Sequence, residues 1–269
     1  MDTNCGIMGD AGRAHRDALI DFWQIGQGSA VLEIGCGQGD TTASLAVRVG
    51  ANGFVHAVDC AAPDYGAPET LGQARERLLK SDVGGRIKMD FQTDVLSPEF
   101  LPTRDCYDYA VLSHCAWYLK SVRELEQILA KVRGFARVLC VAEWDLRMTD
   151  PRQQWHYRAC QLQSVCNAFA PNAQSNVQTL LHRRELISAA TRSGWTVANE
   201  TRLQAPQLQD AVWERGNALE VCPAQLSAMN VPEKLRAQLL AELDELRDAR
   251  AEEMLPLPVL AFTALRQGA

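Results

Sequence analysis

The sequence lacks any uninterrupted apolar run near the ~18 residues that a membrane span requires. Its first residues, MDTNCGIMGDAGRAHRD, also lack the apolar core of a secretory signal. A third absence is a net positive charge: the formal charge of -6 gives no overall basic field for nucleic-acid phosphates, although a local basic patch is compatible with it. We therefore expect a cytoplasmic protein that binds neither membrane nor nucleic acid.

The sequence contains no Cys-x-x-Cys pair, and its cysteines number nine, an odd count. This usage is typical of reduced thiols in a cytosolic protein and predicts neither a disulfide framework nor a metal site. A competing hypothesis is a thiol or metalloid site built from Cys60, Cys160 and Cys222, whose scattered positions support it weakly.

Short β-branched runs alternate with longer helical patterns in the first half of the chain. The predicted strands are 30–35, 54–60, 86–93, 107–114 and 137–144, with helices near 40–49, 69–81 and 121–132. Strand and helix in alternation predict an α/β fold with a doubly wound, mostly parallel sheet. The strands are almost continuously apolar, as expected for strands buried on both faces.

The second half is richer in helix. We expect helices at 150–169, 183–193, 208–221 and 232–254, a loop at 171–176, and strands at 195–203 and 259–265, which bring the sheet to seven strands. One face of the first helix carries Trp155, Ala159, Leu162, Cys166 and Phe169. We interpret 1–269 as a single domain in which 150–182 and 204–254 are helical insertions that form a lid. The same apolar stripes could instead form an oligomer interface, so a monomer and a homodimer both stay open.

A glycine-rich turn follows the first strand. Gly35, Gly37 and Gly39 lie between that strand and a helix, where absent side chains allow a ligand to approach the backbone and the helix N-terminus offers free N–H groups. Asp59, about twenty residues later, is placed to bind ribose hydroxyls. Asp94, expected at the end of the third strand, could accept from an adenine amino group.

The spacing and a neighbouring acid distinguish two candidate cofactors. Dinucleotide folds use G-x-G-x-x-G, whereas Asp40 occupies the position of that third glycine here. Glu33 beside the turn would repel a pyrophosphate but suits an ammonium and a sulfonium, so S-adenosylmethionine is favoured over NAD. A competing interpretation of the turn by itself is a tight strand–helix connection without a ligand.

Glu33, the three glycines, Asp59 and Asp94 together resemble the class I methyltransferase family, as does the run from Tyr107 to His114. The resemblance covers roughly 30–144 and implies a Rossmann-like fold, S-adenosylmethionine as cofactor and S-adenosylhomocysteine as product. The family usually joins its last two strands by a tight hairpin, whereas about fifty residues intervene here. The residues that we expect at the cofactor are Glu33, Gly35, Cys36, Gly37, Gly39, Thr41, Asp59, Cys60, Asp94, Val95 and Ser113.

Candidates for the chemistry lie where strands four and five end. His114 has a near-neutral side-chain pKa suited to a general base, and Glu143 could hold an acceptor amine or hydroxyl. Alternatively, backbone groups satisfy His114, and Glu143 caps a neighbouring helix. The expected substrate pocket consists of Trp117, Tyr118, Trp144 and His156. Alternatively, Trp117 and Tyr118 belong to the hydrophobic core, and His156 lies at the surface. His15 and His182 are interpreted as surface histidines.

The predicted function is methyl transfer from S-adenosylmethionine to an oxygen or nitrogen atom of a small molecule, with aromatic acceptors and secondary metabolites among the candidates. A protein or RNA methyltransferase would share the same core. A non-methylating binder of S-adenosylmethionine, such as a cyclase or a regulatory protein, is an alternative of a different class.

Overall fold

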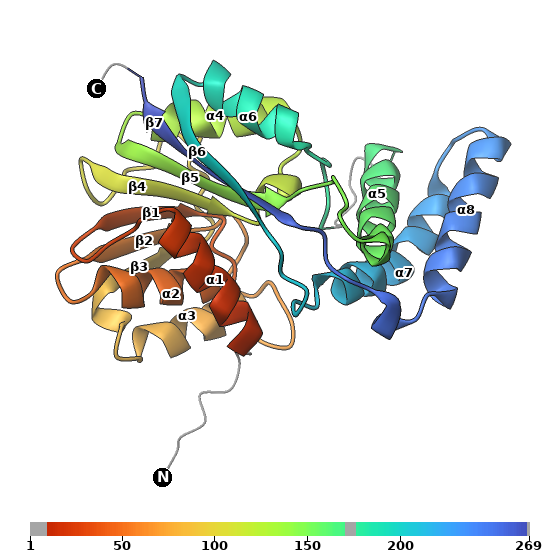
Figure 1. Ribbon diagram of the computed structural model, residues 1–269, viewed down its shortest axis with the longest axis horizontal. Helices are drawn as coiled ribbons and strands as arrows, with labels where there is room; N and C mark the ends of the chain where they lie inside the picture. Colours follow the sequence, from red (N-terminus) through yellow and green to blue (C-terminus); the bar gives the residue numbers. More distant parts are fainter. Residues whose placement is uncertain (1–9, 170–175, 268–269) are drawn as a thin grey trace, which may run out of the picture.

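The fold is a seven-stranded sheet covered by helices on both faces (Figure 1). This computed structural model describes residues 10–169 and 176–267. The strands are β1 (Ala30–Ile34), β2 (Phe54–Val58), β3 (Ile87–Asp90), β4 (Tyr107–Ser113), β5 (Ala136–Trp144), β6 (Trp195–Leu203) and β7 (Val259–Arg266). The α/β class and the number of strands predicted from the sequence are therefore confirmed.

The strand order is β3-β2-β1-β4-β5-β7-β6. The pairs within β1 to β5 are parallel, and β7 lies antiparallel between β5 and β6. The long insertion before β7 therefore leaves the order of the last strands as in the family that the sequence resembles. From β1 the sheet extends in one direction through β2 and β3 and in the opposite direction through β4 and β5. This change of direction creates a switch point at the carboxyl end of β1, where open α/β sheets bind ligands.

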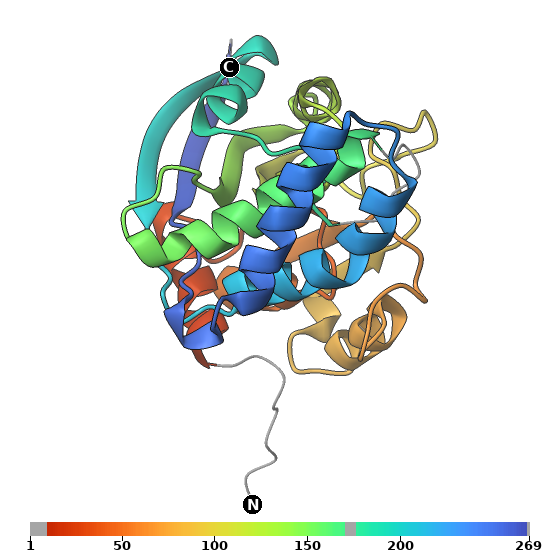
Figure 2. The same ribbon diagram turned by 90° about the vertical axis from the view of Figure 1, so that its right-hand side faces the viewer.

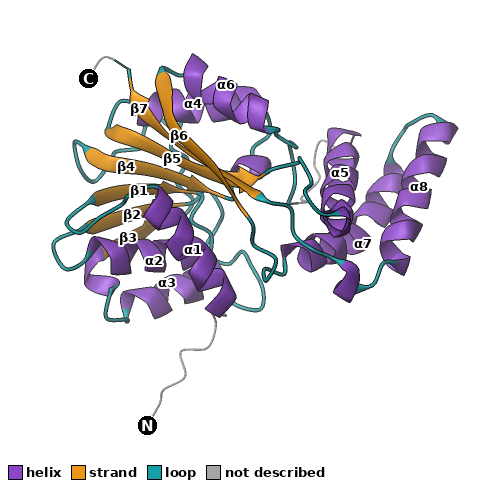
Figure 3. Cartoon of the chain, in the orientation of Figure 1, coloured by secondary structure: helices purple, strands orange, loops and turns teal. Residues whose placement is uncertain are grey.

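Two helical layers enclose the sheet, as Figure 3 shows. One face carries α1 (Asp10–Phe22), α2 (Asp40–Val49) and α3 (Leu71–Leu79), and the other carries α4 (Val122–Val132) and α6 (Arg183–Arg192). Local chemistry defines the helix ends: the Ser121 hydroxyl accepts from Glu124 N at 3.1 Å before α4, and Gly194 with φ of 83° ends α6.

The remaining helices lie beyond the carboxyl ends of the parallel strands. They are α5 (Gln154–Phe169), α7 (Asp210–Ala228) and α8 (Glu233–Asp248), and Figure 2 shows them gathered in front of the sheet. This α5–α7–α8 cluster has an apolar core of its own, to which α8 contributes three leucines. Its buried residues are Ala159, Leu162, Cys166, Ala218, Cys222, Leu226, Met229, Leu239, Leu243 and Leu246. Among the helices at 10–169 and 176–267, none is long and apolar enough to cross a membrane.

Several predicted boundaries were wrong. The third strand ends at Asp90, not at residue 93, because its ladder with β2 stops at the Val58–Asp90 pair. Helix α7 continues past Pro223 to Ala228, since Cys222 and Leu226 are buried on either side and packing overrides the proline. Phe169, expected on the buried face of α5, is half exposed. The predicted loop at 171–176 lies, up to residue 175, outside the described residues.

Helix α1 was not predicted at all. It is amphipathic and buries Leu19 and Ile20, followed by Trp23 and Ile25 just after its last residue. The spacing of His15, Leu19 and Trp23 places these residues one turn apart on one face, and this was the available signal. The turn that follows the helix is bonded to the sheet by the Tyr109 hydroxyl, which donates to Gln24 O at 3.1 Å. Helix α1 also brings His15 to within 3.1 Å of His114 at the end of β4.

Candidate active site

The glycine turn joins β1 to α2 at the switch point of the sheet. Gly35, Gly37 and Gly39 all have positive φ, at 72°, 51° and 81°. A Cβ on Gly35 would lie 2.7 Å from Cys115 Cβ, which is too close. A glycine at this position therefore allows the loop that follows β4 to pack against the turn. A Cβ on Gly37 would meet no atom within 4 Å. Gly37 therefore borders open space, which suits a ligand that approaches the backbone.

Glu33 is buried beneath this turn, with 2% of its surface exposed. One carboxylate oxygen accepts from the Thr42 hydroxyl at 2.6 Å. Burial, countered in part by this hydrogen bond, raises the pKa of Glu33 to about 8. A buried carboxylate of this kind is stabilised in its charged form by a cation, so the residue fits a positively charged ligand.

Asp59, directly after β2, is attached to the glycine turn by its side chain. Its two carboxylate oxygens accept from Gly37 N and Ala61 N, each at 2.9 Å. Each oxygen retains a second lone pair, so the carboxylate can accept further hydrogen bonds from two hydroxyl groups. The structure thus brings together the predicted ribose acid and the glycine turn.

The other predicted cofactor residues differ in placement. Asp94 does not end β3: it lies in the loop four positions later and accepts from Leu96 N at 2.8 Å. Gln92, with φ of 52°, turns the chain between them. Asp94 and Cys60 are exposed, Thr41 is half-buried on the first turn of α2, and Cys36 and Val95 are buried.

His114 follows β4 in a left-handed conformation, with φ of 52°. Such a backbone is uncommon for a non-glycine residue and turns the ring toward neighbours that extended backbone would not reach. Its Nε2 lies 3.1 Å from Nε2 of His15, and its ring centroid lies 4.6 Å from that of Trp144. Burial lowers the pKa of His114 well below its usual value, assisted by the nearby His15, so the ring is neutral at neutral pH.

Trp144 separates His114 from His156, whose ring stands edge-on to it at 4.9 Å. His156 is not a surface residue, since none of it is exposed. Its Nδ1 accepts from Leu257 N at 3.0 Å, which assigns the ring proton to Nε2. Burial lowers the pKa of His156 to about 3. His15, also predicted at the surface, is 6% exposed because α1 packs over the sheet.

Three buried polar atoms at this location have no hydrogen-bond partner among the described residues. They are the Ser113 hydroxyl oxygen, His114 Nδ1 and His156 Nε2. An unpaired buried polar group costs about 1–3 kcal/mol, so three of them near the carboxyl ends of β4 and β5, two of them in rings that flank Trp144, indicate groups that pair with a ligand. The first two end β4, whose next residue, Cys115, donates to Ile34 O at 3.2 Å and so contacts the glycine turn.

Glu143, near the end of β5, is 1% exposed and already holds three backbone N–H groups. One oxygen accepts from Ala116 N at 2.9 Å and Trp117 N at 3.3 Å, and the other from Trp144 N at 3.0 Å. Burial raises the pKa of Glu143 to about 7 despite these bonds. Its Oε1 lies 3.8 Å from His114 Nδ1. These contacts show that Glu143 anchors the turn after β4 and lies close to His114.

The two aromatic residues of that turn have different environments. Trp117 is 3% exposed and its indole N–H donates to Leu181 O at 3.1 Å, which corresponds to the core alternative. Tyr118 is 50% exposed and remains available to a ligand. His182 is exposed at the start of α6, as predicted.

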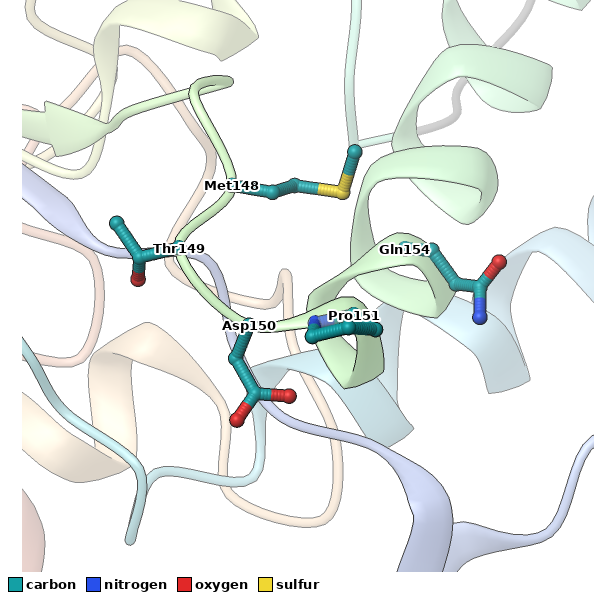
Figure 4. A pocket seen from close by; sticks show the side chains of 5 residues that line it. All are labelled: Met148, Thr149, Asp150, Pro151 and Gln154. Atoms are coloured by element: carbon teal, nitrogen blue, oxygen red, sulfur yellow. The ribbon is translucent and has the colours of Figure 1, made fainter.

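Two further features lie outside this cluster. A hollow of about 410 Å³ is bordered by Met148, Thr149, Asp150, Pro151 and Gln154, between β5 and α5 (Figure 4). It includes none of the residues that surround the glycine turn. Within 10–169 and 176–267, no group of three His, Cys, Asp or Glu side chains is arranged to hold a metal ion. The free thiols of Cys222 and Cys166 share a hydrogen bond, and Cys60 is exposed. The three cysteines of the thiol hypothesis therefore do not form one site.

Comparison with known proteins identifies the family to which the chain belongs. Residues 31–139 match the family described as a methyltransferase domain. A cyclopropane-fatty-acyl-phospholipid synthase-like protein from Lactobacillus casei is 32% identical, with a TM-score of 0.84 over 95% of this chain and 90% of that one. The chain belongs to the class I S-adenosylmethionine-dependent methyltransferases. The cofactor is S-adenosylmethionine, which confirms the ligand inferred from the glycine turn and Glu33.

More distant similarities agree with this fold. Methyltransferase phomM' from Diaporthe leptostromiformis is 27% identical over 63% of this chain and 54% of its own length. The chain therefore spans about half the length of the curated relatives it matches. The [4+2]-cyclase SpnF is 11% identical, with a TM-score of 0.53 over 95% of this chain and 81% of that one, and shows the fold alone.

Glu33 leads to a prediction about pH. In the free protein its pKa is about 8, and a bound cation favours the carboxylate, so binding releases a proton below pH 8. Calorimetric titration with S-adenosylmethionine should therefore show affinity that rises by up to about tenfold per unit between pH 6 and 8. Glu33→Gln should bind weakly with a much flatter pH profile.

The same pKa supplies a stability control for this variant. Because the folded value lies above the ordinary one near 4.5, the folded ligand-free protein holds a proton that the unfolded chain loses. The contribution of Glu33 to the free energy of unfolding therefore decreases between pH 4.5 and 8. Glu33→Gln should melt no lower than the wild type at pH 8. An equally steep affinity profile in this variant would assign the pH effect to another group.

Proposed function

We propose that this protein transfers a methyl group from S-adenosylmethionine to an oxygen or nitrogen atom of a small molecule. The observation that carries the proposal is a set of three buried polar atoms that have no partner among the described residues: the Ser113 hydroxyl at the end of β4, and one ring nitrogen each of His114 and His156, whose rings flank Trp144. They adjoin the glycine turn through Cys115, so an acceptor bound to them would lie beside the cofactor.

The cofactor fits the residues on β1 and β2. Glu33 is a buried carboxylate suited to a cation, Asp59 can accept from ribose hydroxyls, and Gly37 leaves open space. When bound, the cofactor supplies a methyl carbon on a positively charged sulfur, so that no protonation of the leaving group is needed. The protein's task is then to position an acceptor and to remove its proton.

We assign His114 as the general base that removes the proton of the acceptor. Its Nδ1 is buried and has no partner among the described residues, and the ring is neutral at neutral pH, so this atom can accept a proton. Glu143, 3.8 Å from that atom, would stabilise the imidazolium that forms. His156 Nε2–H can donate to the acceptor, and Trp144 provides an apolar surface between the two histidines.

The α5–α7–α8 cluster supports a small acceptor. It lies across the carboxyl ends of the strands and contributes His156 to the site (Figure 2). We propose that this cluster acts as a lid over the site. Lids of this kind exclude water from the reaction and select the acceptor. A protein or RNA substrate would need an open groove at this position.

Two measurements test the proposal. Calorimetric titration should show binding of S-adenosylhomocysteine but not of NADH, and mass spectrometry should show S-adenosylhomocysteine release with some member of a phenol and amine panel. Gly37→Ala should weaken binding while Gly28→Ala does not, since both glycines have positive φ and open space but only Gly37 lies in the turn.

The opposite results are equally informative. Tight nicotinamide binding without a response to S-adenosylhomocysteine would contradict the cofactor. Cofactor binding with no release on any small acceptor, but with methylation of a protein or RNA, would contradict the acceptor class. Rearrangement of an acceptor without release of S-adenosylhomocysteine would support the cyclase alternative.

A further inference from the structure

The N-terminal helix brings a second histidine to the active site. His15 lies on α1 and contacts His114, 99 residues later, through an Nε2–Nε2 distance of 3.1 Å. Helix α1 is held by the buried Leu19 and Ile20, and the turn after it is bonded to Tyr109, so the position of His15 is fixed.

The contact restricts where the protons lie. Burial lowers the pKa of His15 to about 4, and His114 is also neutral, so each ring carries one N–H at neutral pH. A hydrogen bond between two neutral rings needs one donor and one acceptor. If His15 donates, the proton of His114 lies on Nδ1, and His114 has no free lone pair for a base. If His114 donates, its Nδ1 lone pair is free.

The surroundings of His114 Nδ1 favour the second arrangement. Nδ1 is buried and has no hydrogen-bond partner among the described residues. A buried N–H without a partner is rarer in proteins than an acceptor with a spare lone pair. Glu143 Oε1 at 3.8 Å is beyond hydrogen-bond distance, and both oxygens of that carboxyl already accept from backbone N–H groups.

We propose that His15 is a positioning residue that accepts the Nε2–H of His114 and thereby keeps His114 Nδ1 available as the base. This inference rests on the proposed function. As the acceptor's O–H or N–H bond breaks and its new bond to the methyl carbon forms, the carbon–sulfur bond breaks and its electron pair stays on the sulfur of the departing S-adenosylhomocysteine, while the acceptor's proton moves to His114 Nδ1. The resulting imidazolium still donates to His15 and faces Glu143. The other ionisable groups that influence this ring are His156 and Arg16.

The first test observes the tautomer directly and needs no activity. The chain has five histidines, so proton–nitrogen correlation spectra of protein labelled with ¹⁵N-histidine can be assigned by single variants. At neutral pH we expect His114 in the Nε2–H form. His15→Leu should shift it toward a mixture, whereas the exposed His182→Leu should not. An Nδ1–H form of His114 in the wild type would overturn the proposal.

The second test uses kinetics. His15→Leu should lower kcat by roughly tenfold or more without changing the KM for S-adenosylmethionine, as expected for loss of a residue that orients a base. His15→Gln offers an amide oxygen at a similar reach and should restore most of kcat. Equal losses in both variants, with lower melting temperatures, would assign His15 a structural role only.

The two tests also separate this inference from the proposed function. If His114→Ala retains wild-type kcat, the proposed base fails whatever the tautomer is. If His114→Ala is slow but His15→Leu keeps the wild-type kcat and tautomer, the base stands and the role of His15 is wrong.

Discussion

Asp59→Ala is expected to weaken S-adenosylhomocysteine binding by about 10²-fold or more while the protein stays folded. The carboxylate is held by Gly37 N and Ala61 N, which orients it beside the glycine turn. Two charge-assisted hydrogen bonds to the ribose would each contribute about 1.5–3 kcal/mol, and every 1.4 kcal/mol is tenfold in affinity. Removing the side chain also leaves Gly37 N without its partner, which loosens the turn.

Calorimetry on three variants isolates this effect. Asp59→Asn keeps an acceptor oxygen but loses the charge, so its affinity should lie between those of the wild type and Asp59→Ala. Asp64→Ala removes an exposed carboxylate from the following loop and serves as the matched control. Unchanged affinity in Asp59→Ala would place the ribose elsewhere.

The part of the site formed by local sequence was predictable. The glycine turn from Gly35 to Gly37 and the acid after β2 each follow directly on a parallel strand. Because the carboxyl ends of parallel strands meet at one edge of a doubly wound sheet, the strand prediction was enough to bring these residues together. Strand β6 was predicted with its observed bounds, because Gly194 and the alternating pattern after it are local signals.

Asp94 shows where this local reasoning fails. The prediction extended the third strand to residue 93, but pairing with β2 ends at Asp90 and the left-handed Gln92 redirects the chain. Strand length is decided by the partner strand, which the residues of β3 do not encode. Asp94 consequently lies in a loop with its carboxylate bonded to Leu96 N.

The histidines around Trp144 could not be deduced from sequence for a related reason. Their contacts join segments 99 residues apart for His15 and His114, and His156 is fixed by Leu257, 101 residues away. Predicting them required the packing of α1 and α5, whose side chains depend on the assembled sheet. An isolated histidine on a helix is therefore ambiguous until its neighbours are known.

His114→Ala should lower kcat by about 10²-fold or more, with cofactor affinity nearly unchanged, because general-base catalysis contributes about 10²–10⁴-fold. The ring lies at the end of β4 with its Nδ1 buried and unpaired within the described part of the chain. It contacts Trp144 and His15 but none of the groups that we assign to the cofactor, namely Glu33, Gly37 and Asp59. Loss of the base should therefore affect the chemical step and not cofactor binding.

His114→Asn distinguishes the two possible roles of this residue. An asparagine amide can hydrogen-bond near the position of Nδ1 but cannot take a proton. If His114 is the base, His114→Asn should be as slow as His114→Ala under saturating acceptor. If His114 only lines the pocket, His114→Asn should keep kcat, and His114→Ala should raise the KM for the acceptor. The exposed His182→Ala controls for loss of a histidine. Wild-type kinetics in both His114 variants would return this residue to a structural role, because a ring between His15 and Trp144 would then serve packing alone.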